Sequence, residues 1–388
     1  MTGMRTILVG FASCLLVLSS AVIGCAQPSA GTHSTPPTSG KAQSTVFTDV
    51  LQLIPATGNA TLVAYVQDFS RLPQEQRQVP PPSTLPENYP IFQNNRFWDL
   101  RDYNPQEWQS HMGFTRDDVA QEAFAYRIVP MDMYQVMKGS FDKAKIEAAL
   151  KSDPINNDLK TVSYSGIEYF SAGEDGINFM RRSKINNLGQ GLRLAALGDT
   201  ILATSTTHSM QDLIDVQQKK TKSLADLDTY SQIAGGMSRL DAMAVIFSSE
   251  SQAQSSFQEK FKDIIKDPGQ DEGSHLRRNW AEQMQRNVLL EPYQAFAAGI
   301  GLDGKGYYMA VALVHADEAT AKANFGVLEK QVRASNYDEG KSWSELITSM
   351  EVLQDSRLVM ARIYGNAAFR WKAFDPTAGS DPLLMHKG

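Results

Sequence analysis

Hydrophobic and polar positions divide the chain into three stretches of different character. Residues 7–18 are mostly apolar, residues 26–44 hold almost no bulky apolar side chain, and periodic apolar positions begin at Val46. A segment that cannot bury apolar surface cannot offset the entropy lost when its backbone is ordered. We therefore expect residues 25–45 to be a flexible linker, rich in Ser, Thr and Pro, in front of a folded body.

The periodic patterns of the body predict alternating strands and helices. Short apolar runs predict buried strands at 60–66, 123–129 and 242–248. Apolar residues spaced three or four apart predict helices at 48–54, 104–112, 142–151, 208–218, 253–266, 276–290 and 317–333. Turn-forming residues between β-rich runs predict hairpins that turn at 165–166, 198–199, 303–305 and 355–356.

Two distant segments of the body resemble each other. The segment Glu122-Ala-Phe-Ala-Tyr is similar to Gln294-Ala-Phe-Ala-Ala. In both places a strand follows, and then a helix that opens at an Asp, either Asp142 or Asp317. The likeness favours an internal duplication, and coincidence between two generic α+β stretches is the alternative.

The order of the predicted elements indicates the fold class. Hairpins outnumber crossover units, which favours antiparallel or mixed sheets with helices on one face. We therefore predict an α+β fold made of two related halves, residues 46–222 and residues 223–388. Each half is expected to be an antiparallel or mixed sheet with its helices packed on one face.

Residues 1–24 have the three-part shape of a secretory signal peptide. Arg5 and the amino terminus are positive, residues 7–18 are apolar, and the last residues are small or weakly polar. The apolar run is too short to be a comfortable membrane-spanning helix. The segment ends in Val22-Ile23-Gly24-Cys25, which resembles the lipobox of bacterial lipoproteins.

The resemblance to a lipobox implies a lipid anchor. It implies cleavage between Gly24 and Cys25, diacylglycerol on the Cys25 sulfur, and acyl chains such as palmitate at the membrane. Each buried CH₂ contributes roughly 0.8 kcal/mol, so two or three chains hold a protein stably. We therefore expect a cell-membrane lipoprotein whose body lies on the extracytoplasmic side. An uncleaved anchor and plain secretion are the alternatives.

The body also resembles a family of uncharacterised bacterial envelope proteins. Three short motifs carry this resemblance: Leu53-Ile54-Pro55-Ala56, Lys138-Gly139-Ser140-Phe141-Asp142 and Ser223-Leu224-Ala225-Asp226. The resemblance covers most of the body, and it implies an envelope location without implying an activity.

Charge and cysteine content narrow the classes of function. The formal net charge is −6, which argues against non-specific nucleic-acid binding and against a polybasic grip on anionic lipids. The two cysteines are Cys14 and Cys25. Removal of the signal peptide leaves one thiol, so an internal disulfide and a cysteine-based metal site are both excluded.

Catalytic and metal-binding motifs are weak. Ser140-Phe141-Asp142-Lys143 matches S-x-x-K, but the accompanying K-T-G is missing, which favours an ordinary helix start. The six histidines are not spaced three or four apart, so helical metal pairs are not predicted. The acidic turn at 267–273 lacks the ligand order of an EF-hand loop. We predict neither a cofactor nor a metal ion.

An aromatic and basic stretch follows a proline-rich segment. Trp, Tyr and Arg are enriched at binding hot spots. The candidate ligand surface consists of Arg96, Phe97, Trp98, Arg101, Tyr103 and Trp108. Simple packing in a second layer of core is the alternative.

Two functions remain open from the sequence. The first is a non-enzymatic envelope protein that binds or scaffolds, with the membrane and an unidentified protein or lipid as partners. The second is an envelope hydrolase whose site is assembled from distant residues. An enzyme predicts a pocket with a hydrogen-bonded nucleophile and base, whereas a binder predicts a groove or cradle without one.

Overall fold

The computed structural model describes most of the body. The described residues are 46–56, 63–71, 105–127, 132–181, 189–249, 290–334, 336–338, 341–345 and 347–365. All of them belong to one compact unit, Ser44–Gly388. The predicted signal peptide, Cys25, the linker, the predicted helix at 253–266 and all but the last residue of the predicted helix at 276–290 lie outside the described residues.

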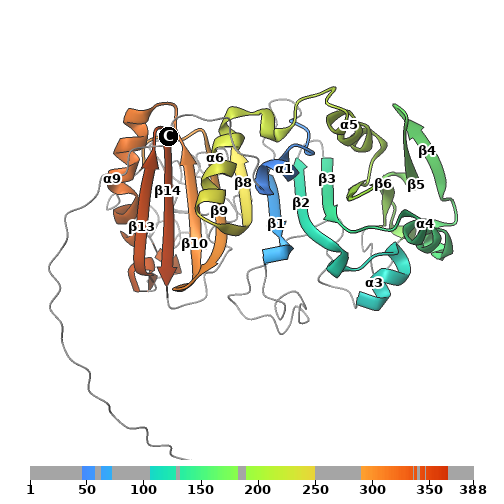
Figure 1. Cartoon of the computed structure of the whole chain (residues 1–388), viewed down its shortest axis with the longest axis horizontal. Coiled ribbons are helices and arrows are strands. Elements are labelled where there is room, and N and C mark those ends of the chain that lie inside the picture. The colour runs from blue at the N-terminus through green and yellow to red at the C-terminus, as the bar shows by residue number, and fades with distance from the viewer. Residues whose placement is uncertain are drawn as a thin grey trace, which may run out of the picture. The chain divides into compact units, whose positions relative to one another are not determined.

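One antiparallel sheet of twelve strands dominates the structure (Figure 1). Its order is β13-β14-β10-β9-β8-β1-β2-β3-β7-β6-β5-β4. The strands are β1 (Val63–Asp68), β2 (Val119–Arg127), β3 (Asp132–Gly139), β4 (Lys160–Tyr164), β5 (Ile167–Ile177), β6 (Gln190–Leu197), β7 (Thr200–Thr204), β8 (Ala242–Ser249), β9 (Ala295–Asp303), β10 (Gly306–Val314), β13 (Ile347–Asp355) and β14 (Leu358–Gly365). A separate short pair joins β11 (Asn336–Asp338) to β12 (Lys341–Ser342).

The described residues hold six α-helices, which lie on both faces of the sheet. They are α1 (Val46–Leu51), α3 (Pro105–Met112), α4 (Lys143–Ser152), α5 (Thr207–Gln217), α6 (Asp228–Arg239) and α9 (Glu318–Ala334). Side chains of α1, α5 and α6 pack into one core with one face of the strands. Side chains of α3 and α4, and those of α9, pack against residues of the opposite face. Among the described helices, none has the length and apolar character needed to cross a membrane.

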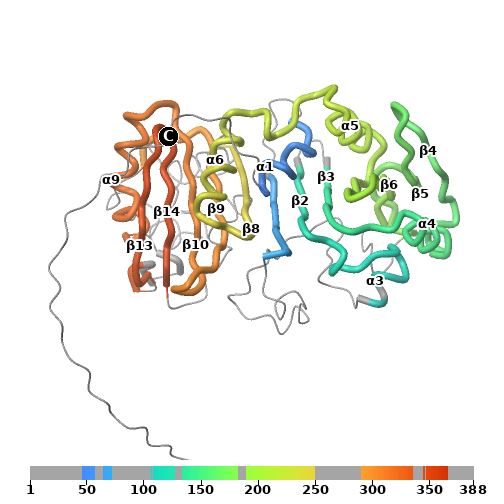
Figure 2. Tube along the Cα trace, in the orientation of Figure 1, coloured from blue at the N-terminus to red at the C-terminus, as the bar shows by residue number. Residues whose placement is uncertain are grey.

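The predicted fold class is wrong in its division into two halves. The strands form one sheet because β1 pairs with β8, with Val66 opposite Val245. Figure 2 shows these two segments, far apart in sequence, as neighbours. The similar segments at Glu122 and Gln294 mark β2 and β9 of this same sheet. Strand β8 is buried along nearly its whole length, so it needs cover on both faces rather than on one.

The predicted boundary at residue 222 lies inside the packed body. The Ala56 N–H donates to the Lys222 carbonyl at 2.9 Å, and the Leu224 N–H donates to the Ile54 carbonyl at 2.8 Å. Two of the motifs that carry the family resemblance therefore meet in space through a short backbone bridge at Pro55 and Ser223. Their role in the structure is to fasten the segment before α6 to the end of α1.

The hairpin predictions are confirmed. Strands β4 and β5 turn at Ser165 and Gly166, whose φ angles are 52° and 80°. Strands β6 and β7 turn at Gly198, with φ of 64°. Strands β9 and β10, and strands β13 and β14, are likewise joined by tight turns. These turns bring strand ends, and the side chains on them, to the edges of the sheet.

Candidate functional site

A row of polar side chains crosses four adjacent strands near one end of the sheet. Asp68 of β1 is directly opposite Gln121 of β2, and Gln121 is opposite Lys138 of β3. Lys138 in turn is opposite Thr200 of β7. On each strand, the polar residue of the row lies on the same face as core residues such as Val66, which pack beneath α1. A polar row therefore begins where that apolar core ends.

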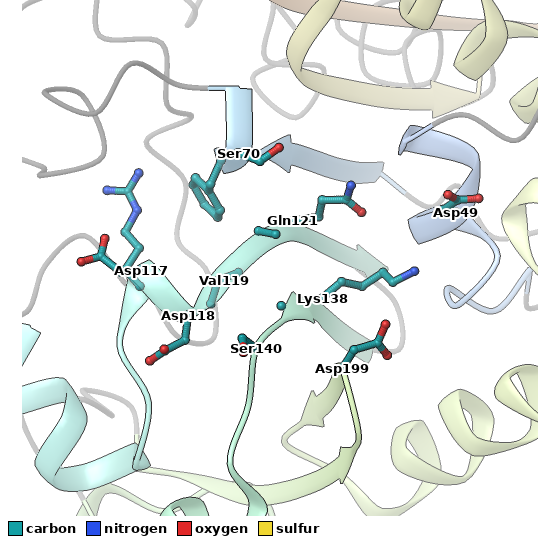
Figure 3. Close-up of a pocket in the computed structure, with 13 residues that line it drawn as sticks. Asp49, Ser70, Asp117, Asp118, Val119, Gln121, Lys138, Ser140 and Asp199 are labelled. Carbon is teal, nitrogen blue, oxygen red and sulfur yellow. The ribbon is translucent and has the colours of Figure 1, made fainter.

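The row borders a pocket with a volume of about 460 Å³ (Figure 3). This volume lies within the roughly 300–1,000 Å³ of small-molecule sites. The walls come from α1, from the 3₁₀ turn after β1 (Phe69–Arg71), from the 3₁₀ turn before β2 (Arg116–Asp118), and from the ends of β2, β3 and the β6–β7 turn. Segments from very different parts of the sequence thus contribute to one concave surface.

The backbone around the pocket is held by a bulge and a glycine. The register between β2 and β3 shifts between Val119 and Gln121, so β2 carries an extra residue at this point. A Cβ on Gly139 would lie 1.9 Å from the Asp118 carbonyl oxygen. That carbonyl accepts a hydrogen bond from the Ser140 N–H at 2.8 Å. Glycine at position 139 therefore allows the two backbones to approach closely enough to form the pocket wall.

The wall before β2 is organised by local hydrogen bonds. The Asp118 carboxylate accepts from the Thr115 N–H at 2.7 Å and from the Thr115 hydroxyl at 3.0 Å. The guanidinium of Arg116 lies 4.7 Å from the centre of the Phe69 ring, which is a cation–π arrangement. Phe69 is itself buried. Both contacts fix the backbone that leads into the bulge.

Two donors in the pocket are unengaged. Within the described part of the chain, the Lys138 ammonium and the Gln121 amide form no hydrogen bond or ion pair. The Asp199 carboxylate accepts from the Thr200 hydroxyl through Oδ1 at 2.9 Å, and it forms no ion pair with Lys138 among the described contacts. The pocket therefore presents an ammonium, an amide and a carboxylate oxygen that are available to a ligand.

The aromatic surface predicted from the sequence is mostly outside the described residues. Arg96, Phe97, Trp98, Arg101 and Tyr103 all lie there. Trp108 is described, and it is only 2% exposed. Its ring meets Phe114 edge-on at 5.9 Å, in the core formed with α4. Trp108 therefore serves in packing, and the role of the other five residues stays a prediction.

The S-x-x-K match at Ser140 is an ordinary helix start. Asp142 caps α4, and its carboxylate accepts from the Ala144 and Lys145 N–H groups at 2.9 and 3.2 Å. Lys143 points elsewhere, toward Glu168 at 3.9 Å, and both side chains are more than half exposed. Ser140 and Lys143 thus do not form a catalytic pair. This agrees with the ordinary helix start that the missing K-T-G motif favours.

The three described histidines contact carboxylates, an amide and a carbonyl. His111 lies 2.9 Å from Asp153, and His208 lies 3.7 Å from Asp212. The buried His315 bonds to a side-chain amide and to a backbone carbonyl. These histidines therefore form no nucleophile–base pair. Within the described ranges, no group of three His, Cys, Asp or Glu side chains is placed to hold a metal ion.

Sequence reasoning found one strand of the pocket and missed the others. Lys138-Gly139-Ser140 was recognised as part of a motif, without a role. Gln121 and Asp199 were not singled out, since a lone polar residue at a strand end or in a turn has no distinctive pattern. The signal that could have pointed to Lys138 is its position on the face that continues the apolar residues of β3, such as Val136.

Comparisons with known proteins give matches to solved structures at low TM-scores. No family model and no curated protein matches the sequence. Solved structures of TP0453 are similar in three crystal forms. Form I gives a TM-score of 0.39 at 9% identity, covering 84% of this chain and 96% of that one. Form III gives 0.36 at 8% identity, covering 82% and 95%. Form IV gives 0.40 at 6% identity, covering 81% and 92%.

Proposed function

We propose that this protein is a lipid-anchored, non-enzymatic binding protein of the cell envelope, which takes up a small polar ligand in the pocket at the ends of β1, β2 and β3. The observation that carries the binding role is the pair of unengaged donors, Lys138 and Gln121, side by side in a pocket of about 460 Å³. An ammonium without a counter-ion at a partly buried position is a poor structural element and a good ligand contact.

The anchoring role is supported by the sequence Val22-Ile23-Gly24-Cys25 and by the Ser, Thr and Pro composition of the linker that follows. Thioether-linked diacylglycerol and an amide-linked chain supply enough buried CH₂ groups for a stable hold on the extracytoplasmic leaflet. The linker then lets the body, which begins at α1, meet soluble ligands. A binding protein needs no more than an anchor, a linker and a pocket.

The anchor is tested by metabolic labelling with an alkyne analogue of palmitate, followed by fractionation of the cells. The protein is expected to carry the label and to sediment with membranes, and Cys25→Ser is expected to abolish both. Cys14→Ser is the matched control, because Cys14 lies in the segment that is removed, and it should leave labelling unchanged. Label that persists in Cys25→Ser would contradict the anchor.

The binding role is tested by native mass spectrometry and by amide NMR on the full-length protein in detergent. Addition of the small-molecule fraction of the cell envelope is expected to produce an adduct and to shift the Gly139 and Ser140 amide signals. Lys138→Met should lose both effects, whereas Lys330→Met, on the exposed side of α9, should keep them. Shifts confined to other regions, or none at all, would reject a ligand in this pocket.

A further inference from the structure

We infer that the ligand of this pocket is a zwitterion of dipeptide size, which carries one free ammonium group and one free carboxylate group. The inference rests on the proposed function, and it starts from the charges that line the pocket. The pocket lining contains two cationic side chains, Arg116 and Lys138, and four aspartates, of which Asp118 already accepts two hydrogen bonds from Thr115. A ligand with only negative charge would meet the excess of carboxylates, and a purely cationic ligand would leave the Lys138 ammonium uncompensated.

Lys138 and Gln121 form the subsite for the carboxylate. They occupy directly opposite positions on β3 and β2, where side chains on the same face lie about 5 Å apart at Cβ. The ammonium and the amide NH₂ are both donors, and a carboxylate has two oxygens that accept. Figure 3 shows both side chains extending to the same side of the sheet. One ligand carboxylate can therefore receive a hydrogen bond from each residue.

Asp199 forms the subsite for the ammonium. It lies in the β6–β7 turn, directly before Thr200, which is the residue opposite Lys138. The Thr200 hydroxyl holds Oδ1 of Asp199 at 2.9 Å, which orients the carboxylate and leaves Oδ2 to accept from a ligand. Asp199 is exposed, so a ligand reaches it without displacing the core.

The separation of the two subsites fits a short peptide. Adjacent strands lie about 4.8 Å apart, and Asp199 is one strand and one residue away from Lys138. Two extended residues span at most about 7 Å, which places the two termini of a dipeptide within reach of both subsites. Lys138 and Asp199 do not pair with each other among the described contacts, so their opposite charges remain available to bridge through a ligand.

The test compares alanyl-alanine with two blocked forms, N-acetyl-alanyl-alanine and alanyl-alanine amide, by calorimetry on the full-length protein. The free dipeptide is expected to bind at least tenfold more tightly than either blocked form, because each block removes one ligand charge and with it the charge assistance of the hydrogen bonds to that group. Lys138→Met should weaken the free dipeptide at least tenfold and leave the amide unchanged. Asp199→Asn should weaken the free dipeptide likewise and leave the N-acetyl form unchanged.

Controls and outcomes separate this inference from the proposed function. Lys330→Met, on the exposed side of α9, should bind all three probes as the unmodified protein does. Equal binding of the free and blocked dipeptides, or binding that ignores Lys138 and Asp199, overturns the zwitterion inference. If no dipeptide binds while the envelope fraction still shifts the Gly139 and Ser140 amides, the inference is wrong and the binding role stands. If neither produces an effect, both are wrong.

Discussion

Asn324 donates a side-chain hydrogen bond to Nε2 of His315 across 2.7 Å. The His315 ring is fully buried, and its Nδ1 lies 3.0 Å from the Arg357 carbonyl. Because a carbonyl can only accept, Nδ1 carries the proton and Nε2 is the acceptor. The second Asn324 N–H donates to the Glu291 carbonyl at 2.8 Å, so the amide is fixed in this orientation. The neutral imidazole thus links β10 to α9 and to the chain before β9.

This buried histidine predicts a loss of stability in mild acid. Burial lowers the pKa of His315 below its usual value of 6.5. The unfolded chain then binds a proton at a pH where the folded protein does not, so the contribution is intact above about pH 6.5 and falls as the pH drops below it. Urea unfolding should show a lower midpoint at pH 5 than at pH 7.5. His315→Gln should reduce this difference in midpoint, whereas replacement of the exposed His208 by Gln should leave it unchanged. The same difference between pH 5 and pH 7.5 in all three proteins would refute the prediction.

The glycine in the pocket wall predicts a steric penalty at position 139. Gly139→Ala places a Cβ 1.9 Å from a backbone oxygen, so the strand ends must separate. We expect a loss of about 1–3 kcal/mol in the free energy of unfolding, as for other overpacked sites. Urea unfolding measures this loss. Gly304→Ala is the control, because its Cβ would meet nothing within 4 Å; a Gly139 variant as stable as this control would contradict the close approach.

A second glycine is coupled to the tyrosine on the adjacent strand. A Cβ on Gly301 would lie 2.1 Å from the Tyr308 ring, whose hydroxyl donates to the Leu240 carbonyl. Gly301→Ala is expected to destabilise the protein by about 1–3 kcal/mol, because the ring must leave this position. In a Tyr308→Ala background the same substitution should cost far less. A double-mutant cycle by urea unfolding gives the coupling, and additive effects would rule it out.

The start of α4 predicts different roles for two neighbouring residues. Asp142→Ala removes the acceptor of two backbone N–H groups and should cost about 1 kcal/mol of stability. Ser140→Ala should leave stability within about 0.5 kcal/mol, because its exposed hydroxyl has no described hydrogen bond. Thermal or urea unfolding distinguishes the two. A larger effect at Ser140 than at Asp142 would show that the cap has been misassigned.

Local features of the fold were predictable from the sequence, and long-range ones were not. The turns at Ser165-Gly166 and Gly198-Asp199 carry their own chemistry, since these positions need a positive φ or a tight reversal. The pairing of β1 with β8 has no such local signal, because two strands can satisfy the same pattern in one sheet or in two. The placement of helices on both faces has no local signal either, because α1 and α5 pack on one face of the sheet while α3 and α4 pack on the other.

The residues of the pocket were likewise only partly predictable from the sequence. Lys138 and Gly139 stood out as part of a motif, but their partners Gln121 and Asp199 are ordinary residues at a strand start and in a turn. The register of β2, β3 and β7 brings them together, and a bulge between Val119 and Gln121 sets that register locally. Because this bulge lies at the very start of β2, it changes the alternation of only one or two residues, which is too short a stretch to recognise in the sequence.

Because β1 lies between β2 and β8 in the sheet, the sheet can be completed only after β8 has been synthesised. Val66 pairs on one side with Ala123, in the next strand along the chain. On its other side it pairs with Val245, which is synthesised only after strands β2 to β7. Until β8 pairs with it, one edge of β1 has unpaired N–H and C=O groups, with which any extended chain can form hydrogen bonds. A fragment ending at residue 222 would keep this open row permanently. Such a fragment would present an aggregation-prone edge.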